Sequence, residues 1–328
     1  MSTALTTRPA ADAVRDLAER QLELADAACE RLKDLSDPNA LHDFRVSLRR
    51  FRSLVRVYKP WFRGALPGKR RRRLKKIVAT TGSARDTEVQ LAWLQGCREK
   101  LRAEDQPGYQ WLTETLRKNL EGEYQLLRSD LPARFRRERK HLHLRLVSDS
   151  GPATPLLGEV TAPLLEANAD QFRSWLESVR GPTGDDAIHQ ARITGKRLRY
   201  LLEPLAPGLS GGKELARELK NLQDLMGEIH DAQVLAGELP GQAERAGAQR
   251  ARRRVEASLG LPRNDPALEA EHRTDEVTGL CALATRLSEE KRGLLAQLYE
   301  RTAESRVAAL HGQLHEAAEQ LRSAAGKG

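Results

Sequence analysis

Two segments of this chain repeat the same order of basic and apolar residues, and this repeat limits the possible folds more than any other feature. LHDFRVSLRRFR at 41–52 aligns with IHQARITGKRLR at 188–199. Farther along, LKKIVATTGSARDTEV at 74–89 aligns with LKNLQDLMGEIHDAQV at 219–234. Two matches in the same order, at nearly the same separation, predict an internal duplication.

The stretch VSDSGPATP at 147–155 separates the two copies and carries residues that interrupt helical patterns. We therefore expect one half at residues 1–148 and the other at residues 155–328. Aromatic residues make up only 4% of the chain, whereas Ala, Leu, Glu, Arg and Gln are abundant, which favours helices over strands. The sequence predicts an all-α protein in which each half forms a four-helix bundle of apolar-periodic segments.

The positive charge of the chain is concentrated in the repeated segments. The formal net charge is +9, but residues 42–76 alone contain fourteen Lys or Arg residues and one acid, Asp43. Residues 189–221 contain seven basic and three acidic residues. The rest of the chain is net acidic, so the basicity is local and points to a polyanionic partner.

Helical periodicity places these charges on one stripe of the first repeated helix. With about 100° per residue, the stripe contains His42, Arg45, Arg49, Arg52 and Arg56. Apolar residues such as Phe44, Leu48 and Phe51 fall on a separate stripe, and the second copy repeats the pattern. Like charges one turn apart are unfavourable by a few tenths of a kcal/mol per pair, so we expect a bound anion to offset the repulsion. The alternative is a solvated face whose arginine stems cover apolar surface.

The second repeated motif aligns a lysine, a glycine and an aspartate in each copy: Lys75, Gly82 and Asp86 with Lys220, Gly227 and Asp231. Glycine inside a helix costs about 1 kcal/mol relative to alanine. We therefore expect another backbone to approach closely at both glycines. The two aspartates are candidates for carboxylates that orient the basic side chains; the alternative is that they are ordinary surface carboxylates.

The repeated His-x-x-Arg-x-x-x-Arg/Lys-x-x-Arg helix, followed by Leu-Lys…Gly-x-x-Arg/His-Asp, resembles the CHAD family, the conserved-histidine α-helical domain, over nearly the whole chain. This resemblance implies two four-helix bundles related by pseudo-twofold symmetry. It also implies basic surfaces that meet around a central cavity or groove and bind inorganic polyphosphate. The polyphosphate ligands implied by the match are His42, Arg45, Arg49, Arg52, Lys75, His189, Arg192, Lys196, Arg199 and Lys220.

The binding surface is expected to be stronger on its N-terminal side. Lys76 has Asn221 as its partner in the repeat, and the run KRRRR at 69–73 has no equally basic counterpart. Arg56 and Lys76 therefore join the candidate polyphosphate ligands.

Two other functional classes compete with polyphosphate binding. Nucleic acid would be attracted by the same charges, but aromatic residues for base stacking are scarce, and no RRM, KH or zinc-finger signature is present. Catalysis is disfavoured because the chain has neither a GxxxxGK[ST] loop nor a clear acidic cluster for magnesium. It also lacks the Glu-x-Glu-x-Lys signature of the triphosphate-processing domain that some family members carry. We expect binding without turnover; an acidic protein partner or a granule-coating role is compatible with it.

No segment has the apolar core of a signal peptide or the length of a membrane span, so we expect a cytoplasmic protein. The family resemblance implies that it associates with polyphosphate granules. The three cysteines are far apart and lack metal-ligand spacing, and we expect them to be buried. His311 and His315 are an i,i+4 pair that could bind a metal, but the sequence offers no third ligand. We therefore predict no metal site and no cofactor.

Overall fold

The computed structural model describes residues 3–34, 37, 39–62, 66–148, 155–181, 183–273 and 275–325. These residues form helices and no strand, apart from an isolated bridge between Pro9 and Leu156. The predicted all-α class is thereby confirmed. Most of the predicted boundary stretch at 147–155 lies outside the described residues. In the described part of the chain, no helix is long and apolar enough to cross a membrane.

The chain divides into two compact units, and each unit contains residues from both sequence halves. Unit 1 comprises Met1–Gly82, Leu126–Gly227 and Gln297–Gly328, and unit 2 comprises Ser83–Gln125 and Glu228–Ala296. The units therefore do not coincide with the halves 1–148 and 155–328, which stay a prediction from the repeat. The chain passes from unit 1 to unit 2 after Gly82 and again after Gly227, the two glycines that the alignment pairs.

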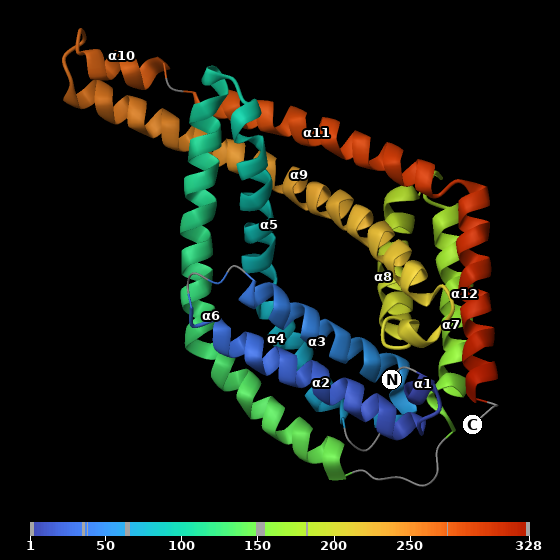
Figure 1. Cartoon of the computed structure of the whole chain (residues 1–328). Helices are drawn as coiled ribbons and strands as arrows, with labels where there is room; N and C mark the ends of the chain where they lie inside the picture. The colour runs from blue at the N-terminus through green and yellow to red at the C-terminus, as the bar shows by residue number, and fades with distance from the viewer. Residues whose placement is uncertain are drawn as a thin grey trace. The chain divides into compact units, whose positions relative to one another are not determined.

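The first half of the sequence contributes one set of helices to unit 1: α1 (Thr3–Thr6), α2 (Ala10–Arg31), α3 (Ala40–Val57), the 3-10 helix η1 (Lys59–Phe62), α4 (Gly68–Thr80) and the second part of α6 (Gln106–Ser148). The second half contributes α7 (Leu157–Glu177), α8 (Gly184–Leu202), the short η4 (Ala206–Gly208), the first part of α9 (Gly212–Gly260), the last residues of α11 (Glu276–Arg301) and α12 (Glu304–Ala325). Figure 1 labels the α-helices among them.

The two copies of the basic repeat are α3 and α8, and they pack against each other within unit 1. Helix α3 buries Phe44, Leu48 and Phe51, the apolar stripe predicted from its periodicity. Each copy also packs against a helix of its own half, α3 against α2 and α8 against α7. Burial of these apolar stripes leaves the basic stripes at the edges of the helices.

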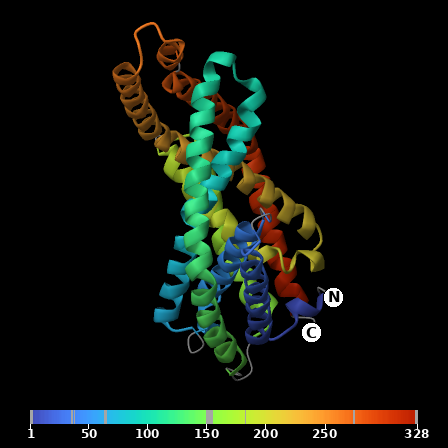
Figure 2. The ribbon, with the colours of Figure 1, turned by 90° about the vertical axis from the view of Figure 1, so that its left-hand side faces the viewer.

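Helices α7 and α12 also pack closely against each other in unit 1. A methyl group added at Gly158 would lie 2.6 Å from the carbonyl oxygen of Leu321, so only glycine fits there. Arg322 of α12 also forms an ion pair with Glu166 of α7. Short helix α1 lies beside α12, as Figures 1 and 2 show.

Unit 2 has a hydrophobic core of its own. It contains α5 (Gly82–Cys97) from Ser83 onward, the short η2 (Arg98–Lys100) and η3 (Ala103–Asp105), the first part of α6, the second part of α9, α10 (Pro266–Arg273) and most of α11. Leucines from α5, α6, α9 and α11 form the core, including Leu94, Leu112, Leu235 and Leu283. Gly108 of α6 and Gly279 of α11 bring their backbones into direct contact.

Two expectations about single residues are wrong. A methyl group at Gly82 or Gly227 would meet nothing within 4 Å, so no backbone in the described parts of the chain approaches closely at either glycine. In the basic repeat the tight position is Gly195 of α8, where a methyl group would lie 3.1 Å from the Phe172 ring. Among the cysteines, Cys29 and Cys97 are buried, but Cys281 is exposed.

Candidate anion-binding site

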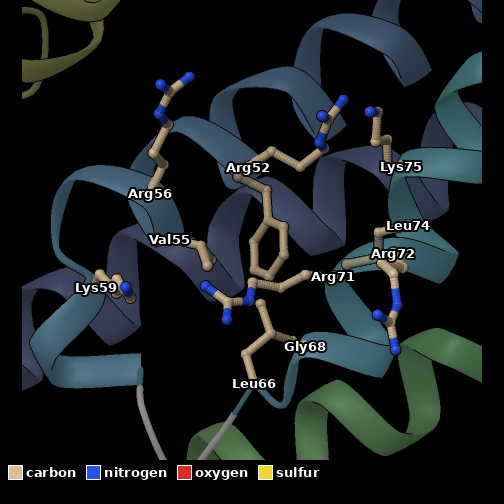
Figure 3. Close-up of a pocket in the computed structure, with 11 residues that line it drawn as sticks. Arg52, Val55, Arg56, Lys59, Leu66, Gly68, Arg71, Arg72, Leu74 and Lys75 are labelled. Atoms are coloured by element: carbon tan, nitrogen blue, oxygen red, sulfur yellow. The ribbon is translucent and has the colours of Figure 1, made fainter.

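A basic pocket opens between the end of α3 and the start of α4 in unit 1 (Figure 3). Its volume is about 670 Å³, within the usual range for small-ligand sites. Six cations line it: Arg52, Arg56, Lys59, Arg71, Arg72 and Lys75. Phe51, Val55, Leu66 and Leu74 supply an apolar floor. In Figure 3 the ends of Arg52, Arg56 and Lys75 point the same way, whereas Arg71 reaches toward Val55.

These six cations differ from nearby basic residues such as Arg50, Arg70 and Arg73, which form ion pairs with carboxylates. The described residues that line the pocket include no acidic residue. Within the described residues, none of the six forms an ion pair. Their charges are therefore available to an anion from solution.

The local electrostatics show that the cations repel one another. Burial and the neighbouring charge of Arg56 lower the pKa of Arg52. Burial and the same neighbour, Arg56, also lower the pKa of Arg197 on α8. Because Arg56 acts on a cation of each repeat copy, positive charge from α3 and α8 accumulates at one place. A bound anion would relieve this repulsion.

Helical spacing directs some side chains of the basic run at 69–73 toward α6 and others toward the pocket. Arg70 and Arg73, three residues apart, donate to the two carboxylate oxygens of Glu138 on α6, at 2.8 and 2.9 Å. Glu138 is buried; burial alone would raise its pKa, but the hydrogen bonds from the two arginines outweigh burial and lower it. The two residues between them, Arg71 and Arg72, line the pocket. Glu138 thereby fixes the helix that presents them.

Two predicted ligands on α3 hold helices together. Arg45 donates to the hydroxyl of Thr81 at 2.7 Å and to the carbonyl of Val78 at 3.3 Å, at the C-terminal end of α4. A cation at this end of a helix is stabilised by the exposed carbonyls. Arg49 donates to the hydroxyl of Tyr200 on α8 at 2.9 Å. These bonds position α3 relative to α4 and α8.

Two predicted ligands of the second copy are paired with carboxylates. The Arg199 side chain is only 11% exposed and lies 3.1 Å from Glu203, which also accepts a hydrogen bond from Arg50. The Lys220 ammonium lies 2.6 Å from Asp224 on the exposed side of α9. An anion would have to compete with these carboxylates for both cations.

The remaining candidates lie outside the pocket lining. His42 and Lys76 are exposed in the first copy; the second copy presents an exposed His189 and half-buried Arg192 and Lys196. Asp86 and Asp231 are exposed and belong to unit 2, whereas the basic helices belong to unit 1. The orienting role of these two aspartates stays a prediction.

Four residues at or beside the pocket were absent from the sequence-based set: Lys59, Arg71, Arg72 and Arg197. Lys59 continues the three- and four-residue spacing of Arg52 and Arg56, so extending the stripe would have found it. Arg71 and Arg72 lie in a run whose charge was evident, but the run alone did not show which members face the pocket.

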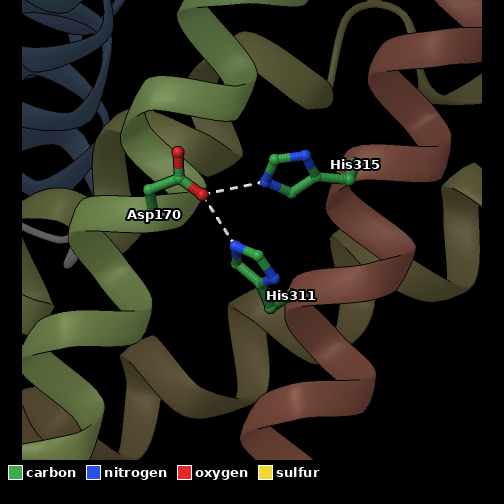
Figure 4. A group of neighbouring side chains, drawn as sticks. All are labelled: Asp170, His311 and His315. Atoms are coloured by element: carbon green, nitrogen blue, oxygen red, sulfur yellow. Dashed lines mark hydrogen bonds and ion pairs between the residues drawn. The ribbon is translucent and has the colours of Figure 1, made fainter.

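A separate cluster involves the histidine pair of α12. Asp170 of α7 accepts hydrogen bonds from the Nε2 atoms of His311 and His315, at 2.7 and 2.9 Å (Figure 4). These hydrogen bonds lower the pKa of Asp170. The sequence supplied no third potential metal ligand near the pair, and the expectation of no metal site rested on that gap. The structure supplies one from a helix far away in the sequence.

Comparisons with known proteins agree with this architecture. A family model for the CHAD domain matches residues 16–240. A crystal structure of the CHAD domain from the plant Ricinus communis is 20% identical with a TM-score of 0.60, covering 94% of this chain and 93% of that one. PptA from Streptomyces chartreusis is 16% identical with a TM-score of 0.60, covering 89% of this chain and 100% of that one. At these identities the two structures show the fold alone. No curated protein matches the chain.

Proposed function

This chain belongs to the CHAD-domain family, and we propose that it binds inorganic polyphosphate at the basic pocket of unit 1. One observation carries the proposal: six cations line a pocket of about 670 Å³, and no carboxylate is found among its described lining residues. A cluster of like charges is unfavourable in the unliganded protein, since its members repel one another. Its presence is explained if an anion with several charges occupies the pocket.

The mixture of cations fits a polymer of phosphates. Arginine can donate two parallel hydrogen bonds to phosphate oxygens, whereas lysine acts as a point charge. Arg52, Arg56, Arg71 and Arg72 therefore fix phosphate groups, and Lys59 and Lys75 add neutralising charge. A longer polymer continues from Arg56 toward Arg197 and the other cations of α8, which is how the second copy of the repeat takes part.

The other parts of the proposal follow from the family and the repeat. The chain binds polyphosphate without hydrolysing it and associates with polyphosphate granules. Its two halves arose by duplication, because the alignment pairs Gly82 with Gly227 and both mark a passage between units. Duplication accounts for two copies of the basic helix packed together.

A competition assay tests the proposal. Fluorescently labelled polyphosphate of defined length is titrated with the protein, and unlabelled polyphosphate, duplex DNA or RNA is then added at equal phosphate concentration. We expect polyphosphate to displace the probe at much lower concentration than either nucleic acid. Equal displacement by DNA or RNA would indicate a general polyanion or nucleic-acid binder. Release of inorganic phosphate in the presence of magnesium would show that the protein is an enzyme.

A further inference from the structure

The cluster on α7 and α12 has the composition of a transition-metal site. His311 and His315 lie one turn apart on α12, and their rings are 4.3 Å apart between centroids. Both Nε2 atoms point to the same oxygen of Asp170 on α7 (Figure 4). Potential ligand atoms of the three residues lie within 4.8 Å of one another. Two imidazoles and one carboxylate are a ligand set that zinc and related divalent metals prefer.

The backbones that carry the three ligands are held firmly. Asp170 follows the buried Ala169, and the two histidines follow the buried Leu310 and Leu314. Close backbone packing at Gly158 joins the same two helices farther along. Because helix packing fixes the three Cα positions, the ligand atoms are already gathered before any metal arrives, which reduces the entropy lost on binding.

We propose that Asp170, His311 and His315 bind one divalent transition metal ion of the zinc class, which links α7 to α12. Zinc bonds of about 2.0–2.1 Å in a tetrahedral arrangement separate the ligand atoms by about 3.3 Å. The observed distances from Oδ1 of Asp170 to the Nε2 atoms of His311 and His315 are 2.7 and 2.9 Å. A shift of the carboxylate by about half an ångström therefore brings both of these separations to the tetrahedral value.

The fourth position of the metal is open to water. The Asp170 side chain is 60% exposed, and those of His311 and His315 are 20% and 38% exposed, so solvent reaches the ion. Three protein ligands with a free fourth position are typical of catalytic rather than structural zinc sites. The metal adds a cross-link between two helices that are already packed.

The test uses full-length protein without a histidine tag, because a tag would bind the same metals. Cys281 is exchanged for Ser in every variant, since an exposed thiol is itself a zinc ligand. Zinc is titrated in competition with a chromogenic chelator after treatment with EDTA. We expect one zinc ion per chain, with binding at least tenfold weaker in Asp170→Asn and lost in the double variant H311A/H315A. His141→Ala, which removes an exposed histidine of α6, is the matched control and should bind zinc as the parent does.

Imidazole NMR signals provide a second measurement, which identifies the histidines that bind the ion. Zinc should shift the signals of His311 and His315 in the folded protein and leave that of His141 unchanged. Two results would overturn the proposal: no zinc bound at micromolar concentrations, or unchanged zinc binding by a folded H311A/H315A variant. Circular dichroism confirms that each variant is helical.

Discussion

Removal of three pocket cations should separate specific binding from general attraction to a basic protein. We consider the triple variant R52Q/R56Q/K75Q, whose three original side chains point the same way in the pocket. Each lost hydrogen bond to a charged group costs at least about 1.5 kcal/mol of binding free energy. Three losses amount to about 4.5 kcal/mol, which weakens the affinity for polyphosphate by more than about a thousandfold.

The dependence of polyphosphate affinity on salt concentration gives a second quantitative test. Each neutralised phosphate of a flexible polyanion contributes about 0.7 to the slope of log K against log salt concentration. Six pocket cations predict a slope of about −4, and the triple variant should retain about −2. Fluorescence anisotropy with labelled polyphosphate between about 50 and 200 mM salt measures both the affinity and this slope.

The control removes the same number of charges elsewhere. Arg98, Lys118 and Arg292 are exposed residues of unit 2, and none forms an ion pair with another described residue. The variant R98Q/K118Q/R292Q should bind polyphosphate within a few-fold of the parent. If the two triple variants lose affinity equally, only net charge matters and the pocket is not the site. Thermal unfolding of the pocket variant checks that it stays folded, since removing repelling cations should not destabilise it.

Two further predictions concern stability. Glu138→Ala leaves Arg70 and Arg73 without their carboxylate and should lower the free energy of unfolding by about 2 to 3 kcal/mol at pH 7, measured with urea. Because the pKa of Glu138 is lowered in the folded protein, the stabilisation that Glu138 provides is present above the usual carboxyl pKa. It is lost as the pH falls through the folded-state pKa. A loss of unfolding free energy in the Glu138→Ala variant as large at pH 3 as at pH 7 would contradict this. Gly158→Ala should destabilise the protein by about 1 to 3 kcal/mol, because another backbone lies against this glycine. Gly227→Ala, where space is open, should stabilise it by up to about 1 kcal/mol. A higher melting temperature for Gly158→Ala than for Gly227→Ala would refute the packing argument.

Local properties of the sequence were sufficient to predict the helices and the basic stripe. Apolar residues at helical spacing predicted that Phe44, Leu48 and Phe51 would be buried in α3, as they are. Charge is also a local property, and the excess of cations before residue 77 indicated the N-terminal side on which the pocket lies. Arg52, Arg56 and Lys75 were predicted as ligands and line the pocket together.

Only the tertiary structure decided which cations remain available and which distant residues meet. Glu138 lies 68 residues from Arg70, and Asp170 lies 141 residues from His311, so no local periodicity relates them. The same limit explains the error at Gly82 and Gly227, because a helical glycine does not show whether another backbone lies opposite it. Sequence determined which face of each helix is apolar or charged, since that depends on residue spacing alone. Packing determined the partner of each face, since hydrogen bonds and ion pairs act over a few ångströms between helices whose arrangement residue spacing does not fix.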